Sequence, residues 1–115
     1  MNNDLKVSEL GILEKKELFN NLFDFYGELL TDKQRAYFQD YSFEDMSLSE
    51  IATTYGVSRN AIFDQISKVY TNLLDYEKKL GLYQKFQELE NILNQYKNSS
   101  SLEVLELIKK IEEIE

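Results

Sequence analysis

The stretch SLSEIATTYGVSRNAIFDQIS, residues 47–67, decides the fold because it contains two helix starts separated by one stop. Ser47 and Glu50 have the spacing of a capping box, in which each side chain binds the backbone amide of the other residue. Gly56 supplies a left-handed turn that other residues adopt only with strain, and Ser58 is a residue type that caps a following helix. The stretch therefore predicts two short helices joined by a tight turn, a helix-turn-helix.

The apolar residues of this stretch indicate how the two helices cross. Ala52 is small where the second helix passes close to the first, and Val57 is expected to fill the turn. Ile62 and Ile66 turn one face of the second helix inward. The opposite face is then the candidate binding surface, where in nucleic-acid readers the N-terminal residues approach base edges. Its candidate residues are Ser58, Arg59, Asn60, Phe63, Asp64, Ser67 and Lys68. Lys33 and Arg35, from the helix expected between Thr31 and about Tyr41, are candidate contacts to a phosphate backbone.

Helical periodicity continues on both sides of residues 47–67. A first helix from Glu14 carries two apolar stripes, namely Leu18, Leu22, Phe25, Leu29 and Phe19, Phe23, Tyr26, Leu30. Thr31 and Gln34 predict a capping box for the next helix, which ends near Tyr41. The helix from Ser58 continues along a heptad seam to Leu80, Gly81 interrupts it, and the spacing resumes over residues 82–96. Ser100 with Glu103 is the predicted cap of a last helix.

These elements predict an all-α fold, a small helical bundle that contains the helix-turn-helix and has long C-terminal helices. The expected organisation is a flexible N-terminal arm over residues 1–13, a helical domain over residues 14–97, and a linker with a C-terminal helix over residues 98–115. The helices offer more apolar surface than a three-helix unit needs. Either they pack within one five- or six-helix chain, or a homodimer buries the surplus.

Composition argues against an enzyme. Cysteine and histidine are both absent from the 115 residues, which excludes disulfides and cysteine-zinc sites and removes the commonest general base. The four glycines are isolated, so they form no glycine-rich phosphate loop. Acidic neighbours such as Glu44-Asp45 and Glu112-Glu113 lack the loop spacing of a calcium site and are interpreted as solvated helix ends. We therefore expect no catalysis, no metal and no cofactor.

Charge limits the partners that the chain can bind. The net charge is −8 and the isoelectric point is near 4.6, which favours solubility and repels phosphate backbones. Residues 31–81 contain six basic and eight acidic side chains, and Asp64 lies where a groove-facing residue would meet phosphate. The chain shows neither a secretory signal nor a run of about 20 apolar residues, so the expected location is the cytoplasm, without membrane insertion.

Three stretches resemble the YlxM-like family of small bacterial helix-turn-helix proteins. They are LFDFYGELLTDKQRAYF (residues 22–38), YSFEDMSLSEIATTYGVSRNAIFDQI (41–66) and LLDYEKKLGLYQKF (73–86), together about half of the chain. The helix-turn-helix is also similar to the promoter-binding end of sigma factors. Two departures stand out: Ser42 replaces a usual aromatic residue, and Ser67-Lys68-Val69 replaces a more basic stretch.

The resemblance implies a regulatory protein connected with the signal recognition particle pathway. For the family this connection comes mainly from gene neighbourhood beside the particle's GTPase, which is an association and not a mechanism. Three hypotheses follow. The first is an adaptor that binds a protein such as the particle's GTPase, or its RNA, through the candidate residues; the second is a transcription regulator that reads double-stranded DNA from Arg59 onward; the third is a structural dimerisation module.

Overall fold

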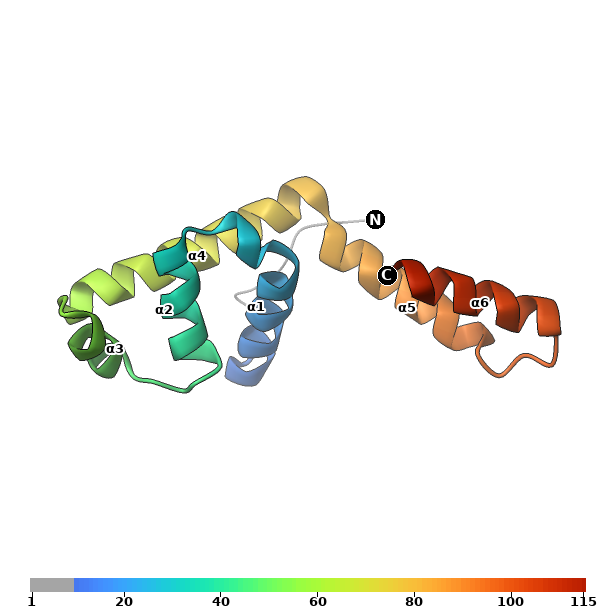
Figure 1. Cartoon of the computed structure of the whole chain (residues 1–115), viewed down its shortest axis with the longest axis horizontal. Coiled ribbons are helices and arrows are strands. Elements are labelled where there is room, and N and C mark those ends of the chain that lie inside the picture. Colours follow the sequence, from blue (N-terminus) through green and yellow to red (C-terminus); the bar gives the residue numbers. More distant parts are fainter. Residues whose placement is uncertain (1–9) are drawn as a thin grey trace. The chain divides into compact units, whose positions relative to one another are not determined.

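The computed structural model describes residues 10–115, which form six α-helices and one short 3-10 helix (Figure 1). The elements are α1 (Ile12–Tyr26), the 3-10 helix η2 (Gly27–Leu29), α2 (Asp32–Ser42), α3 (Leu48–Tyr55), α4 (Arg59–Leu80), α5 (Leu82–Tyr96) and α6 (Leu102–Ile114). The predicted all-α fold is confirmed. Among the described residues, every helix falls short of the length and apolar character that a bilayer-spanning segment requires.

The chain forms two compact units, one ending at Tyr83 and one comprising Gln84–Glu115. The sequence instead grouped residues 14–97 into one domain and set 98–115 apart. The division differs because α5 pairs with α6, and Leu93 of α5 and Ile108 of α6 are the buried residues of that hairpin. Residues 1–9 of the expected arm lie outside the described residues, while Ile12 and Leu13 already belong to α1.

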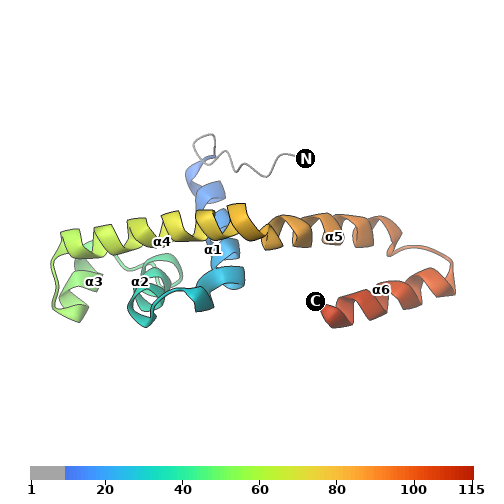
Figure 2. The same cartoon turned by 90° about the horizontal axis from the view of Figure 1, so that it is seen from above.

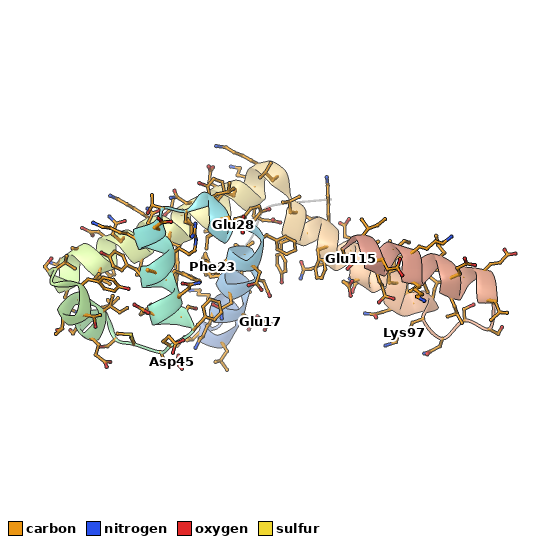
Figure 3. The ribbon with its side chains drawn as sticks, viewed as in Figure 1. Glu17, Phe23, Glu28, Asp45, Lys97 and Glu115 are labelled. Carbon is orange, nitrogen blue, oxygen red and sulfur yellow. The ribbon has the colours of Figure 1, made fainter. Side chains whose placement is uncertain are left out.

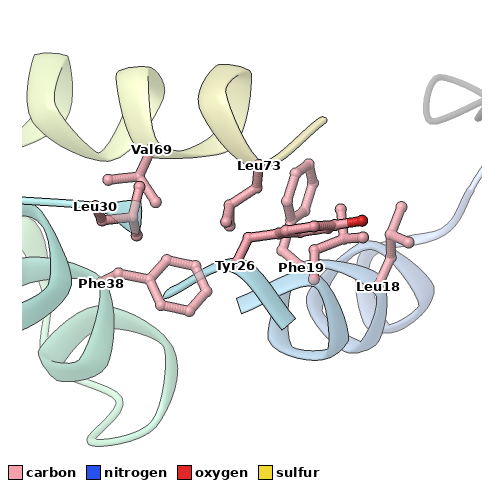
Figure 4. Close-up of a cluster of buried hydrophobic side chains, with 8 residues drawn as sticks. Leu18, Phe19, Tyr26, Leu30, Phe38, Val69 and Leu73 are labelled. Carbon is pink, nitrogen blue, oxygen red and sulfur yellow. The ribbon is translucent and has the colours of Figure 1, made fainter. Parts of the chain in front are cut away.

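In the first unit, α1, α2 and α3 lie on the same side of the long helix α4, and Figure 2 shows α1 crossing it steeply. Two adjoining clusters form the core. The larger joins α1, α2 and α4 and contains Leu18, Phe19, Leu22, Tyr26, Leu30, Phe38, Val69 and Leu73 (Figure 4). The smaller joins α2, α3 and α4, and the ring of Tyr70 packs against both. The long helix α4 therefore contacts α1, α2 and α3 and positions the candidate site.

Aromatic rings fix the packing of α1. The Phe23 ring, labelled in Figure 3, stacks on the Phe38 ring of α2 with centroids 4.6 Å apart, and the Phe19 ring stacks on Tyr70 of α4 at 4.1 Å. Stacked rings add directional attraction to the burial of their apolar surface. Lys16 adds an ion pair at 2.9 Å to Asp45, which lies in the connection between α2 and α3.

Two expectations for the apolar stripes are corrected. Leu29, placed inward by a continuous helix, is 55% exposed, because α1 ends at Tyr26 and η2 rotates the chain away from that stripe. Phe25, still within α1, is 36% exposed and its ring lies beside that of Tyr83. In α4, Leu80 is exposed and does not belong to the buried seam that its spacing predicted. The buried residue of the last turn is Glu77. One of its carboxylate oxygens accepts hydrogen bonds from the Tyr26 hydroxyl and the Tyr83 amide, which offsets part of the cost of burying it.

The predicted interruption at Gly81 is confirmed, and the cap of the last helix lies one residue later than predicted. Gly81 ends α4 with φ of 63°, in the left-handed region that glycine adopts without a steric penalty. At the start of α6, the Ser101 hydroxyl, and not that of Ser100, accepts a hydrogen bond from the Val104 amide. The Ser99 hydroxyl accepts from the Ser101 amide and shapes the preceding turn.

Candidate binding surface of the helix-turn-helix

The turn between α3 and α4 has the predicted local geometry. The Ser47 hydroxyl accepts from the Glu50 amide at 3.1 Å, and the Glu50 carboxylate accepts from the Ser47 amide at 3.0 Å, which completes the capping box. Gly56 has φ of 69° and ends α3, and the Ser58 hydroxyl accepts from the Ala61 amide at 3.1 Å to begin α4. The hydrogen bond from the Ser47 amide also lowers the pKa of Glu50, so this cap is charged at neutral pH.

The two helices cross over a small buried cluster, as their apolar pattern predicted. Ala52 of α3 packs with Ile62 and Ile66 of α4, and Tyr37 of α2 closes the cluster. Val57 differs from expectation: its side chain is 41% exposed and does not fill the turn. The turn is held instead by its backbone, since the Val57 amide donates to the Ala52 carbonyl at 3.0 Å.

A polar contact holds α3 against α2. The Tyr55 hydroxyl donates a hydrogen bond of 3.0 Å to the Asp40 carboxylate, and this bond raises the pKa of Tyr55. The Tyr55 ring also meets the Tyr37 ring edge-on, with centroids 4.9 Å apart. The helix-turn-helix is therefore supported by α2 as a three-helix unit, which is the support that a rigid recognition helix needs.

The outer face of α4 carries the predicted residues at its surface. Its exposed residues in the first three turns are Arg59, Asn60, Phe63, Asp64, Ser67 and Lys68. Phe63 is 53% exposed, which is unusual for a ring that the adjoining core could have buried. Ser58 lies at the edge of this face, and its hydroxyl is engaged as the cap of α4.

One side of this face continues into a cavity of about 420 Å³ between α2 and α4. Lys33 lines it from α2, and Asp64 and Lys68 line it from α4. The side-chain amide of Gln34 donates a hydrogen bond from Nε2 to the side-chain oxygen of Gln65 at 3.5 Å across the cavity. Gln65 was missed as a site residue because it lies on the border between the inward and outward faces of α4. Only the position of α2 makes it a lining residue, and the periodicity of α4 contains no signal for that.

Arg35 has a different environment from the other candidate residues. Its guanidinium donates to the Gly27 carbonyl at 3.2 Å and to the Leu30 carbonyl at 3.3 Å, and it lies 3.5 Å from the Asp32 carboxylate. Gly27 is the first residue of η2 and Leu30 directly follows it, so the guanidinium spans this short helix. The structure thus places Arg35 on the connection between α1 and α2, apart from Lys33 and Lys68.

The chemistry of the surface is mixed. Arg59, Lys68 and Lys33 supply positive charge for a small number of phosphate or carboxylate contacts, and Asp64 lowers the local potential among them. The Asn60 amide can donate and accept at once, as required for contact with a base edge or a peptide group. The exposed Phe63 ring can stack on an unpaired base or cover an apolar side chain. This combination suits a partner with both polar and apolar surface.

Comparison with known proteins gives a consistent assignment. Residues 13–114 match the model of the UPF0122 family, described as "Putative helix-turn-helix protein, YlxM / p13 like". A UPF0122 protein of Geobacillus sp. (strain WCH70) is 44% identical over 110 residues, covering 90% of this chain and all of that protein. UPF0122 proteins of Anoxybacillus flavithermus and Bacillus cereus (strain AH187) are each 42% identical over 110 residues, covering 90% and 88% of this chain and all of their own length.

Match and structure agree, because the matched residues include both helices of the helix-turn-helix, the Gly56 turn between them and the supporting helices α1 and α2. The relatives are well above the identity at which only a fold is shared, and their whole length is covered. The chain therefore belongs to the UPF0122 family of YlxM / p13-like helix-turn-helix proteins.

Proposed function

We propose that this chain is a regulatory adaptor protein, without catalytic activity, that acts in the cytoplasm in or beside the signal recognition particle pathway. It binds a protein or an RNA through the outer face of α4. The observation that carries this proposal is that α1, α2 and α3 cover the inner face of α4, while Arg59, Asn60 and Phe63 stay exposed at its start. The link to the signal recognition particle pathway comes from the family resemblance.

The charge of the surface favours a protein or a folded RNA over a long duplex contact. A duplex reader gains most of its affinity by neutralising phosphates, and this face offers few cations for that purpose. Asp64 lies on the same face and lines the cavity with Lys68. The half-exposed Phe63 ring adds an apolar contact that a protein surface or an unstacked RNA base can use, and that duplex phosphates cannot.

A second candidate function is transcription regulation by binding double-stranded DNA. The observation in its favour is the geometry of a helix-turn-helix reader: Arg59 and Asn60 occupy the first turn of the second helix, where base edges are read. Lys33 lies near the start of α2 and lines the same cavity as Lys68, so the two could flank one strand of a phosphate backbone. This candidate requires a steep dependence of affinity on salt.

A titration separates these functions. The full chain is added to three fluorescently labelled probes, namely a DNA duplex, the RNA of the signal recognition particle and the particle's GTPase, at low and at moderate salt. Binding to the GTPase that changes little with salt, or binding to the RNA above the level of the duplex, supports the adaptor. Binding to the duplex with a steep salt slope supports the transcription regulator.

If the chain binds none of the three probes, both functions are refuted and only a structural dimerisation module remains. Non-specific electrostatic binding can be recognised in the same titration. Its affinity rises with the charge of the probe, and it is lost equally for the DNA and the RNA at moderate salt. Circular dichroism of the same samples reports helix content and checks that a protein that binds no probe is folded.

A further inference from the structure

The hairpin of α5 and α6 has an apolar groove along its length. The two helices run antiparallel and meet at Leu93 and Ile108, which are the buried residues of the unit Gln84–Glu115 (Figure 1). A groove of about 220 Å³ lies between them, and every residue that lines it is apolar or aromatic, including Ile92, Tyr96, Leu107 and Ile111. Apolar side chains that stay exposed along such a groove mark it as a candidate contact surface.

Each helix of the hairpin carries a second apolar row beside the one that packs. In α5 the second row is Ile92 and Tyr96, one turn apart and each 53% exposed. In α6 it is Leu107 and Ile114, two turns apart, with 58% and 86% exposed. A helix that packs against one neighbour needs one apolar row, whereas a helix in a four-helix bundle contacts two neighbours and needs a wider face. The pattern is that of half a bundle.

The size of the hairpin supports the same conclusion. The unit Gln84–Glu115 spans two helices joined by a short connection, and units of fewer than about 40 residues rarely bury enough apolar surface to be stable without a further partner. A two-helix hairpin that leaves Ile92, Leu107 and Ile114 exposed lies below this limit. Helix–helix contacts from outside the hairpin therefore have to supply the missing burial.

We infer that a second copy of this chain covers the groove, so that two α5–α6 hairpins form an antiparallel four-helix bundle and the protein is a homodimer. A second hairpin brings helices of the same two lengths and the same apolar rows, and a two-fold contact buries both grooves at once without leaving an apolar edge. Charge is compatible with this pairing. Glu103 and Lys110 are exposed and two turns apart on either side of Leu107, so an antiparallel copy of α6 places each beside the opposite charge of its partner. Lys110 also pairs with Glu106 of its own helix at 3.4 Å, and both of these side chains stay largely exposed, so this surface ion pair leaves Lys110 within reach of a second carboxylate.

This inference does not depend on the function proposed above, because the hairpin and the helix-turn-helix are separate units. It adds a consequence for any partner that carries two binding sites. Two helix-turn-helix surfaces held in one dimer bind such a partner more tightly than one surface does, provided that both can be engaged together.

The test is the mass of the full chain in solution, measured by sedimentation equilibrium and light scattering at micromolar concentrations. The expected species is a dimer of twice 13.6 kDa. Leu107→Glu places a charge in the groove of both copies, so we expect the dimer dissociation constant to rise by about 100-fold or more. Leu29→Glu is the matched control: Leu29 is 55% exposed, lies in η2 outside the hairpin, and its substitution adds the same charge without loss of the dimer.

Folding of the variants is checked by circular dichroism. If Leu107→Glu loses helix content, the uncharged Leu107→Gln and Ile92→Gln variants take its place, and each is expected to weaken the dimer by about tenfold or more. A wild-type chain that stays monomeric at these concentrations would overturn the inference and leave the groove to a different protein or to the chain itself. An unchanged dimer in folded Leu107 and Ile92 variants would also overturn it, because the dimer would then use another surface.

Discussion

The Tyr26 hydroxyl donates a hydrogen bond of 2.5 Å to the Glu77 carboxylate in the buried contact between α1 and α4. Both oxygens also accept from the backbone at the start of α5. The Tyr26 oxygen accepts from the Leu82 amide at 3.0 Å, and the same Glu77 oxygen accepts from the Tyr83 amide at 3.0 Å. Two residues that are distant in sequence therefore satisfy the first amides of α5, which would otherwise lack partners. This pair fixes the turn at Gly81 to α1.

Removing the Tyr26 hydroxyl tests that relationship. Tyr26→Phe leaves the Leu82 amide without its acceptor and the buried Glu77 carboxylate without one of its donors. Unsatisfied buried groups of this kind cost about 1–3 kcal/mol, so we expect the free energy of unfolding in urea to fall by that amount. Tyr55→Phe is the control, because it removes an exposed hydrogen bond to Asp40 and should cost much less. Equal losses in the two variants would contradict the account.

The same pair predicts a dependence of stability on alkaline pH. Burial, followed by the hydrogen bond to Glu77, raises the pKa of Tyr26 from 10.0 to about 12. Burial likewise raises the pKa of Tyr70 to about 12. Because both folded pKa values exceed the unfolded value, the contribution of these residues is complete below about pH 10 and is lost as the pH rises through 12. Urea unfolding between pH 8 and pH 12 should show a decline that is shallower in Tyr26→Phe. Parallel declines in the two proteins would be the opposite result.

Gly56 tests the helix-turn-helix itself. Its φ of 69° is strained for any residue with a Cβ, although a Cβ there would meet no atom within 4 Å. Gly56→Ala should therefore destabilise the fold by about 1–2 kcal/mol through backbone strain alone. Gly56→Asn should cost less than the alanine variant, since asparagine tolerates the left-handed region better. Thermal unfolding followed by circular dichroism gives the order of stability. An alanine variant as stable as the wild type would contradict the turn described here.

Arg35 and Lys33 are expected to separate stability from binding. Arg35→Lys replaces a guanidinium that reaches the Gly27 and Leu30 carbonyls with an ammonium that cannot hold the same fork, so the unfolding midpoint in urea should fall. Lys33→Ala changes an exposed residue of the cavity between α2 and α4 and should leave the midpoint unchanged. Affinity for the bound probe should respond to Lys33→Ala. A loss of stability in Lys33→Ala, or none in Arg35→Lys, would contradict the assignment of Arg35 to stability and Lys33 to binding.

Sequence patterns were sufficient for features that depend on neighbours along the chain. Both capping boxes, the stops at Gly56 and Gly81 and the cap at Ser58 follow from local backbone demands, and all are present. The inward residues Ile62 and Ile66 followed from helical period. The exposure of Asn60 and Asp64 followed from the same period, whereas their role in binding stays a prediction.

Features that depend on distant packing were not predictable in this way. Glu77 is a charged residue in an apolar seam, and its burial makes sense only once Tyr26 and the start of α5 are placed beside it. The involvement of Arg35 with η2 depends on the break at Gly27, which the two apolar stripes concealed because they continue at helical spacing across it to Leu29 and Leu30. The pairing of α5 with α6 was missed because heptad spacing on α5 does not say which helix covers it.

The central claim is that the outer face at the start of α4 is the binding surface. The most direct test compares two double variants of the same helix against the probe that the chain binds, by fluorescence anisotropy at moderate salt. Arg59→Ala with Lys68→Ala, and Lys78→Ala with Lys79→Ala, each remove two positive charges from exposed positions of α4. We expect the first pair to raise the dissociation constant by about tenfold or more, and the second to change it by less than about twofold. Equal effects of the two pairs would show that net charge and not this surface governs binding, and would contradict the claim.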